Sequence, residues 1–191
     1  MICTSVTDQS QVAEARRVLA SLAESHGFDE EARARVALVV TELATNLVKH
    51  ARDGHLLAEA DEYDAVPALN VLALDRGPGM PSVEHCLRDG FSTIGSPGTG
   101  MGAIMRQANA FDISSVTDVG SAIYVRLDSG RTPFSLAERS EPVGVVCLPK
   151  LHEEANGDAW AMSGSEGERT YLVVDGLGHG VAAAEAAQAA V

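Results

Sequence analysis

The chain has 191 residues and a formal net charge of −13, and 46% of its residues are hydrophobic. This length can bury one core of about 100–150 residues with some sequence left over, so we expect one complete domain and a fragment. The acidic excess argues against nucleic acid and anionic membranes as partners, because both select for clustered Lys and Arg.

The first 50 residues follow a strand and two helix patterns. A short strand is predicted over residues 2–6, and Asp8 or Ser10 is expected to cap a helix that ends at Gly27. Asp29 then caps a second helix, from about Glu30 to Ala51. The buried stripe of this second helix is predicted to consist of Val36, Val39, Val40, Leu43 and Leu47.

Strand and loop patterns dominate the next 80 residues. The predicted elements, in chain order, are strands at 56–60 and 68–74 around an acidic turn at Asp61–Asp64, a short helix near 82–87, a glycine-rich loop at 95–102, a helix to about Ala110, and a closing hairpin of 111–116 and 122–127.

Three polar residues of the second predicted helix share one face. Glu42, Asn46 and Lys49 stand at i, i+4 and i+7, which at about 100° per residue places them within roughly 60° of each other. This row flanks the apolar stripe. On its own, the pattern is weak evidence for a site, and solvated charges with a surface amide are the alternative.

Two glycine-rich segments follow. Asp75-Arg76-Gly77-Pro78-Gly79 comes directly after an apolar strand. A carboxylate there can accept a hydrogen bond from an exocyclic amine, and the glycines let the backbone approach a flat ring. Gly98-Thr99-Gly100-Met101-Gly102 opens a predicted helix, whose unpaired N–H groups and positive dipole end favour phosphate. An ordinary turn and a flexible loop are the alternatives.

Taken together and in this order, the three segments resemble the N, G1 and G2 boxes of the GHKL superfamily. Their sequences are most similar to those of the small anti-sigma and antagonist serine kinases of the RsbW and RsbT type. The segments that carry this similarity are VVTELATNLVKHA, DRGPGMP and FSTIGSPGTGMG. The resemblance covers residues 1–130. It implies an α+β fold, the GHKL (Bergerat) α/β sandwich, with a mixed sheet and helices on one face.

The resemblance also implies roles for individual residues. Glu42 would be the general base, Asn46 would hold Mg²⁺ against the phosphates of ATP, and Asp75 would bind the adenine amine. The further nucleotide contacts implied are Lys49, Gly77, Gly79, Gly98, Thr99, Gly100, Gly102 and Ser121. The alternative for Lys49 is an exposed helix charge, and the alternative for Ser121 is a hairpin hydroxyl without a role in binding.

Other activities of the superfamily fit this sequence poorly. A histidine kinase needs a dimerisation helix with a phosphoacceptor histidine ahead of Glu42, and His26 lacks the usual acidic neighbour. Gyrase and Hsp90 types need long transducer domains. We therefore expect an ATP- and Mg²⁺-dependent serine/threonine kinase that acts on a STAS-domain antagonist or another sigma-factor regulator. The alternative is a module that uses ATP only to regulate partner binding.

The C-terminal part follows a different pattern. Residues 131–142 contain Pro133 and Pro142 and are predicted to form a linker, and three strands are predicted at 143–148, 159–162 and 171–174. A loop and an alanine-rich helix come after the third strand. We expect residues 143–191 to be covered, either by docking on the first domain or by pairing in a homodimer, because the predicted strands are apolar.

Two aspartates beside glycines stand at the ends of these strands. The order Asn156-Gly157-Asp158 and then Asp175-Gly176-Leu177-Gly178-His179-Gly180 resembles the opening of SpoIIE and RsbX type phosphatases of the PPM family. The resemblance implies that Asp158, Asp175 and the Gly176 carbonyl are an incomplete set of Mn²⁺ or Mg²⁺ ligands in a truncated, inactive phosphatase segment. Ordinary turns are the alternative.

The compartment is predicted from cysteines and apolar runs. Cys3, Cys86 and Cys147 are far apart, without disulfide or thiolate zinc spacing. No apolar run approaches the roughly 20 residues that span a bilayer, and the first ten residues lack the features of a secretion signal. We expect a soluble cytoplasmic protein.

Overall fold

The computed structural model describes residues 1–63, 66–87, 100–130, 145–150, 153–165 and 168–191. The chain divides into two compact units, Met1–Glu138 and Arg139–Val191. The boundary falls inside the segment 131–142, which lies outside the described residues.

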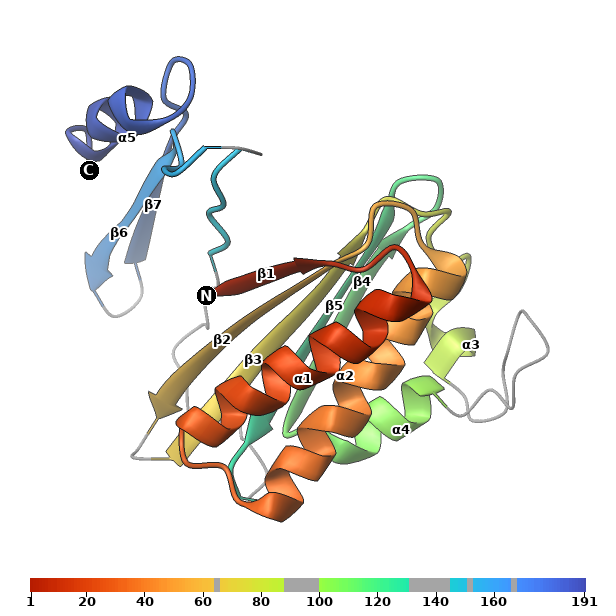
Figure 1. Ribbon diagram of the computed structural model, residues 1–191. Helices are drawn as coiled ribbons and strands as arrows, with labels where there is room; N and C mark the ends of the chain where they lie inside the picture. Colours follow the sequence, from red (N-terminus) through yellow and green to blue (C-terminus); the bar gives the residue numbers. More distant parts are fainter. Residues whose placement is uncertain (64–65, 88–99, 131–144, 151–152, 166–167) are drawn as a thin grey trace. The chain divides into compact units, whose positions relative to one another are not determined.

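The first unit contains a five-stranded sheet with the order β1-β2-β3-β5-β4 (Figure 1). All pairings among its described strands are antiparallel, so the expected mixed sheet is wrong. For β2–β3 and β4–β5 the reason is their short connections, since a short connection permits only antiparallel pairing. The strands are β1 (Ile2–Ser5), β2 (His55–Tyr63), β3 (Val66–Asp75), β4 (Ala110–Val116) and β5 (Gly120–Asp128).

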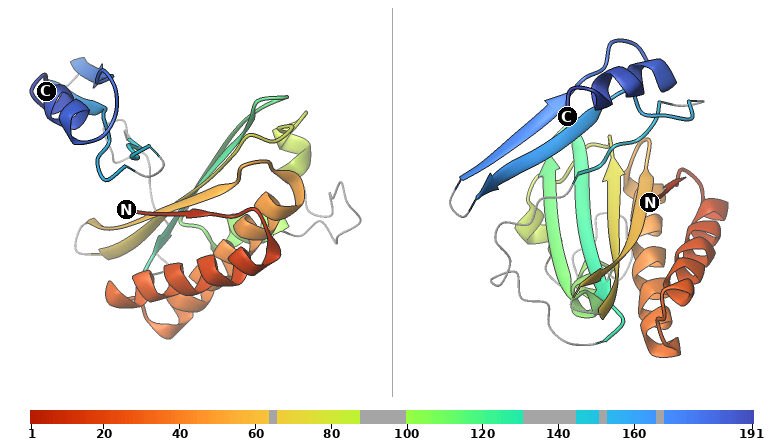
Figure 2. Two further views of the ribbon diagram at one scale, coloured as in Figure 1. Left: turned by 45° about the horizontal axis from the view of Figure 1, so that its top comes forward. Right: turned by 90° about the vertical axis from the view of Figure 1, so that its left-hand side faces the viewer.

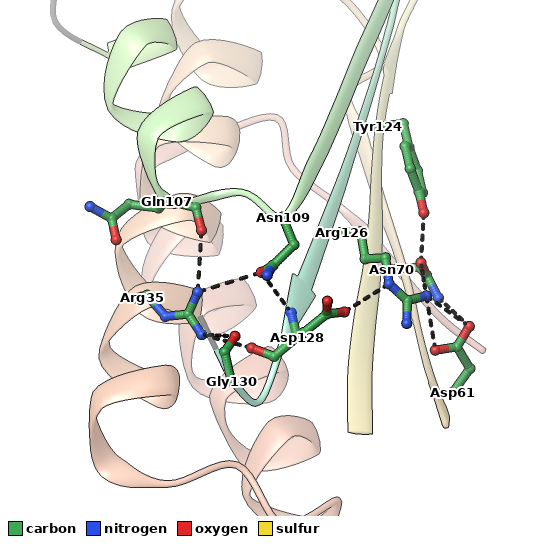
Figure 3. A network of polar contacts seen from close by, with 9 residues as sticks. All are labelled: Arg35, Asp61, Asn70, Gln107, Asn109, Tyr124, Arg126, Asp128 and Gly130. Atoms are coloured by element: carbon green, nitrogen blue, oxygen red, sulfur yellow. Dashed lines mark hydrogen bonds and ion pairs between the residues drawn. The ribbon is translucent and has the colours of Figure 1, made fainter. Parts of the chain in front are cut away.

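The strand β2 is longer than expected. The acidic turn predicted at Asp61–Asp64 is wrong as far as Tyr63, because these residues continue the β2 ladder opposite β3. Arg126 of β5 explains how an acidic residue is accommodated there, since its Nη1 lies 3.2 Å from Oδ1 of Asp61 (Figure 3). Because β3 lies between β2 and β5, this ion pair reaches across the intervening strand.

Two long helices begin where capping residues predict. The Asp8 side chain accepts from the N–H groups of Ser10 and Gln11 and caps α1 (Gln9–Ser25). Asp29 caps α2 (Glu30–His50) by accepting from the Ala32 N–H at 2.8 Å. Between the helices, Gly27 has a φ of +80°, which favours glycine.

The third and fourth helices are short. The helix expected near 82–87 is α3 (Val83–Leu87), and the helix after the glycine-rich segment is α4 (Gly100–Gln107). Gly100 and Gly102 therefore lie in the first turn of α4 and not in a loop, and α4 ends before Ala110, which begins β4. Gly98 and Thr99 lie outside the described residues.

The core of this unit lies between the helices and the sheet. Figures 1 and 2 show α1, α2 and α4 on one face of the sheet, as expected from the sequence. The predicted stripe of α2 is confirmed, since each of its five side chains is at most 5% exposed. The facing side chains of the two central strands are Leu69, Val71 and Ala73 of β3 and Ile123, Val125 and Leu127 of β5, all of which are buried in the same cluster.

The second unit is a hairpin followed by a helix. It comprises β6 (Ala159–Ser165), β7 (Glu168–Val174) and α5 (Val181–Gln188). The predicted strand at 143–148 is wrong for residues 145–148, which have no regular structure and pair with no described strand, while 143–144 lie outside the described residues. An apolar run alone cannot form a strand without a ladder partner.

None of the described helices combines the length and apolar composition that crossing a membrane requires.

Candidate functional site

The polar row of α2 contains two side chains with no partner among the residues that the structure describes. Glu42 and Asn46 are half-buried, and neither forms a hydrogen bond or an ion pair within the described part of the chain. Lys49, the third member of the row, is exposed in the last turn of α2. A carboxylate and an amide at the rim of a core, without protein partners, are available to a ligand.

The beginning of α4 lies against these two side chains. A Cβ at Gly100 would be 2.7 Å from Oε2 of Glu42 and 3.9 Å from Oδ1 of Asn46. A larger residue at position 100 would require the end of the Glu42 side chain to shift. The first turn of α4, which includes the buried Gly102 and whose N–H groups have no acceptor within the helix, therefore lies beside Glu42 and Asn46.

The Asp75 carboxylate stands at the end of β3. Its Oδ1 accepts a hydrogen bond from the N–H of Gly77 at 2.6 Å, which fixes the orientation of the carboxylate. Its Oδ2 forms no hydrogen bond among the described residues. Gly77 is buried against the end of α2, where a Cβ would lie 3.0 Å from the His50 carbonyl.

Ser121 is the cross-strand partner of Asp75. Its hydroxyl lies 2.9 Å from the hydroxyl of Ser115, which also accepts from the Met80 N–H and donates to the Gly120 carbonyl. The sequence prediction missed Ser115. The register of the predicted hairpin could have indicated it, because Ser115 stands directly opposite Ser121.

The loop after Asp75 is locked to the β4–β5 hairpin. Gly79 has a φ of +67°, and a Cβ there would collide with the carbonyl oxygen of Val116. A Cβ at Gly120 would collide with the Asp75 carbonyl in the same way. The Asp118 N–H donates to the Pro78 carbonyl at 2.9 Å. These close backbone contacts hold Asp75 in place.

These groups lie along one stretch of α2. Glu42 meets Gly100, and His50 meets Gly77 eight residues later, which corresponds to about 12 Å at about 1.5 Å per residue. One end carries helix N–H groups beside unpartnered oxygens, and the other end carries the Asp75 carboxylate. Desolvation and the charge of Lys49 lower the pKa of His50, which keeps the imidazole neutral at physiological pH.

The second unit brings its two predicted ligands to one end of the hairpin. Asp158 precedes β6 and Asp175 follows β7, next to the paired residues Ala159 and Val174. Both aspartates are exposed, and Gly176 is buried with its backbone close to the Gly157 carbonyl.

Among the described residues, the surroundings of this pair supply no further ligand. Nδ1 of His179 lies 2.6 Å from Oε1 of Glu153, so these two side chains are bound to each other. Within the described residues, no group of three His, Cys, Asp or Glu side chains is arranged to hold a metal ion. Two carboxylates alone leave most of a six-oxygen shell to water.

The comparisons with known proteins agree with the geometry of the first unit. The model of the histidine kinase-like ATPase domain matches residues 6–127. The chain is 30% identical over 121 residues to the serine/threonine-protein kinase RsbT of Bacillus subtilis (strain 168), which covers 63% of this chain and 91% of RsbT.

Two solved structures show weaker likeness. The mycobacterial sensor histidine kinase MprB is 15% identical, with a TM-score of 0.42 over 66% of this chain and 96% of MprB. The nucleotide-free catalytic domain of the histidine kinase ThkA is 15% identical, with a TM-score of 0.40 over 68% of this chain and 99% of that domain. The assignment rests on the family model, which covers more than half of the chain. The chain therefore belongs to the family of histidine kinase-like ATPase domains.

Proposed function

We propose that residues 1–130 bind ATP with Mg²⁺ and transfer its γ-phosphate to a serine or threonine of a protein partner. The observation that carries this proposal is the unpartnered Glu42 carboxylate beside Gly100 and the first turn of α4. A positioned base next to helix N–H groups suits proton removal from a hydroxyl close to phosphate. The similarity to a serine/threonine-protein kinase supports the same chemistry.

The adenine would bind at the other end of the site. The free Oδ2 of Asp75 is the acceptor for the exocyclic amine, because Oδ1 is occupied by the Gly77 N–H. Gly77 and Gly79 would leave room for the ring, and Ser121 would contribute its hydroxyl beside Asp75.

The phosphates and the metal would bind at the Glu42 end. The Asn46 amide oxygen is a hard, unpartnered ligand of the kind that holds Mg²⁺ together with phosphate oxygens. When bound, Mg²⁺ would neutralise charge on the transferring group. The glycine-rich segment Gly98-Thr99-Gly100-Met101-Gly102 would cradle the phosphates, with Lys49 as a further contact.

The proposed step conserves atoms and charge. Glu42 takes the proton of the substrate hydroxyl, the hydroxyl oxygen forms a bond to the γ-phosphorus, and the bond from that phosphorus to the bridging oxygen of ADP breaks. The proposed substrate is a STAS-domain antagonist in a bacterial partner switch. The alternative is a module that binds ATP to regulate a partner and transfers nothing.

Transfer of radiolabelled phosphate separates these two functions. The purified chain is incubated with γ-labelled ATP, Mg²⁺ and a panel of STAS-domain proteins, with Asn46→Ala as a variant expected to lose Mg²⁺-dependent ATP binding. Label on a serine or threonine supports the kinase. ATP binding without label on any panel member supports the regulatory module.

We propose that the second unit is the opening of a PPM-type phosphatase. Support comes from the placement of Asp158 and Asp175 at the same end of one hairpin, with the Gly176 carbonyl adjacent. Because these residues supply only part of a metal shell, we expect no Mn²⁺-dependent hydrolysis of p-nitrophenyl phosphate by the 191-residue chain. A longer protein should hydrolyse it and lose this activity with Asp175→Ala. An inactive longer protein would remove support for the phosphatase.

A further inference from the structure

Arg35 of α2 joins three segments of the first unit (Figure 3). It is 8% exposed, and its Nη2 donates to the carbonyls of Asp128 at 2.7 Å and Gly130 at 3.2 Å. Its Nη1 donates to the Gln107 carbonyl at 3.4 Å and to Oδ1 of Asn109 at 3.5 Å. The guanidinium therefore contacts the end of α4 and the residues with which β5 leaves the sheet.

Burying this charge is costly. All four acceptors are neutral, and Nε of Arg35 has no hydrogen-bond partner in the described part of the chain. An unbranched apolar side chain would fill the same volume without desolvating a cation. An arginine at this position therefore points to a role that requires its donors.

One such role concerns the placement of α4. The first residue of α4, Gly100, lies against Glu42, and the carbonyl of its last residue, Gln107, faces Arg35. The carbonyl end of a helix is partially negative, so a cation there stabilises the helix in place. Between the two ends, the side chain of Ile104 is fully buried in the core.

Two further hydrogen bonds hold the residues with which β5 leaves the sheet. Oδ1 of Asn109 accepts from the Asp128 N–H at 2.9 Å, and the Pro67 carbonyl accepts from the Ser129 N–H at 2.8 Å. These two amide protons report directly on whether residues 128–130 are docked. Their exchange with solvent is therefore a measure of the attachment that Arg35 supports.

We propose that Arg35 is a positioning residue that sets α4 for phosphate binding and ties the position of α4 to the chain exit at 128–130. The inference rests on the ATP binding proposed above. A triphosphate at the first turn of α4 would favour the placed helix, and the Arg35 contacts would then hold the exit more firmly. Because coupling between two sites is reciprocal, loss of the exit contacts should also weaken ATP binding.

The test measures ATP binding and amide exchange on the same samples. Calorimetry gives the affinity for ATP with Mg²⁺, and NMR gives the exchange rates of the Asp128 and Ser129 amides with and without nucleotide. We expect ATP to slow both amides by on the order of fivefold in the unaltered chain. In Arg35→Met, this slowing should be absent and ATP should bind on the order of fivefold more weakly.

The control is Arg33→Met on the same helix, because Arg33 is ion-paired to Glu24 away from α4 and the exit of β5. It should leave affinity and exchange unchanged. Arg35→Lys serves if Arg35→Met does not fold, since it keeps the charge but cannot reach all the acceptors, and it should lose most of the slowing.

The outcomes separate the two proposals. ATP binding without any slowing at Asp128 and Ser129, or slowing that persists in both Arg35 variants, overturns the role of Arg35 and leaves the proposed function intact. Absence of ATP binding by the unaltered chain overturns the proposed function and this inference with it.

Discussion

Gly100 and Glu42 approach so closely that a methyl group at position 100 would lie 2.7 Å from Oε2 of the carboxylate. The contact joins the first turn of α4 to the middle of α2. It brings a helix N-terminus, where phosphate is favoured, next to a side chain that can take a proton.

Gly100→Ala should lower the rate of phosphoryl transfer without lowering the stability of the fold. Gly100 begins α4 and alanine has the higher helix propensity, so the substitution should not weaken the fold, while its methyl group pushes the Glu42 carboxylate aside. Misplacing a catalytic group by about 1 Å can cost on the order of 10²-fold in rate. Thermal unfolding should therefore show an equal or higher Tm, and phosphoryl transfer should fall. Unchanged transfer would show that this contact does not position the base.

Asp75→Asn should weaken ATP binding. Because Oδ1 is held by the Gly77 N–H, the substituted amide would place its NH₂ group where Oδ2 was, with a donor facing the adenine amine. The unaltered site should also prefer ATP to GTP, since guanine presents a carbonyl at this position.

Calorimetry with both nucleotides measures these effects. Asp112→Asn is the matched control, because Asp112 is exposed on β4 and is not among the residues described above as holding Asp75. Equal affinities for ATP and GTP, or an unaffected Asp75→Asn, would remove the adenine contact from Asp75.

Gly79→Ala and Gly27→Ala form a matched pair of stability tests. Both glycines have positive φ, +67° and +80° respectively, so alanine strains either backbone by about 1 kcal/mol. At Gly27 the new methyl group meets nothing within 4 Å, whereas at Gly79 it collides with the Val116 carbonyl. Urea unfolding should show the larger loss for Gly79→Ala. Similar losses would mean that the loop and the hairpin are not locked together.

Asp128 should contribute a pH-dependent loss of stability. Its burial raises the pKa of the carboxyl above the ordinary 3.8, although Arg126 Nε donates to it at 2.7 Å. The folded state therefore binds the proton more tightly than the unfolded state, and stability falls as pH rises through the folded pKa. Asp128→Asn lacks this titration and keeps an oxygen for Arg126.

The comparison is made by urea unfolding at about pH 4 and about pH 7. The free energy of unfolding of Asp128→Asn relative to the unaltered chain should rise between these two values. A constant or falling difference would show that ionised Asp128 is not penalised by burial.

Local sequence patterns were sufficient to predict the placement of some of these residues but not of others. The apolar stripe fixed the face of α2, and hence the placement of Glu42 and Asn46 at its edge, because helical periodicity is set within the helix itself. Arg35 shares the buried side of that helix with Ala32 and Val39. Its acceptors at 107–130 are far along the chain, so no local signal indicated them.

Strand ends were least predictable for the same reason. The acidic Asp61 looked like a turn residue, yet it stays in β2 because Arg126 of β5 reaches it. Conversely, residues 145–148 form an apolar run of the kind found in strands but have no described strand partner. In both places the outcome depended on a contact distant in sequence.

The most direct test of the central claim is the rate of γ-phosphate transfer by Glu42→Gln at saturating ATP. Glutamine keeps the shape of the side chain but cannot accept the proton, so ATP affinity should stay within a few-fold while transfer falls by about 10²–10⁴. Glu30→Gln, an exposed change at the start of the same helix, should transfer at the unaltered rate. Equal transfer by Glu42→Gln and the unaltered chain would contradict the assignment of Glu42 as the base.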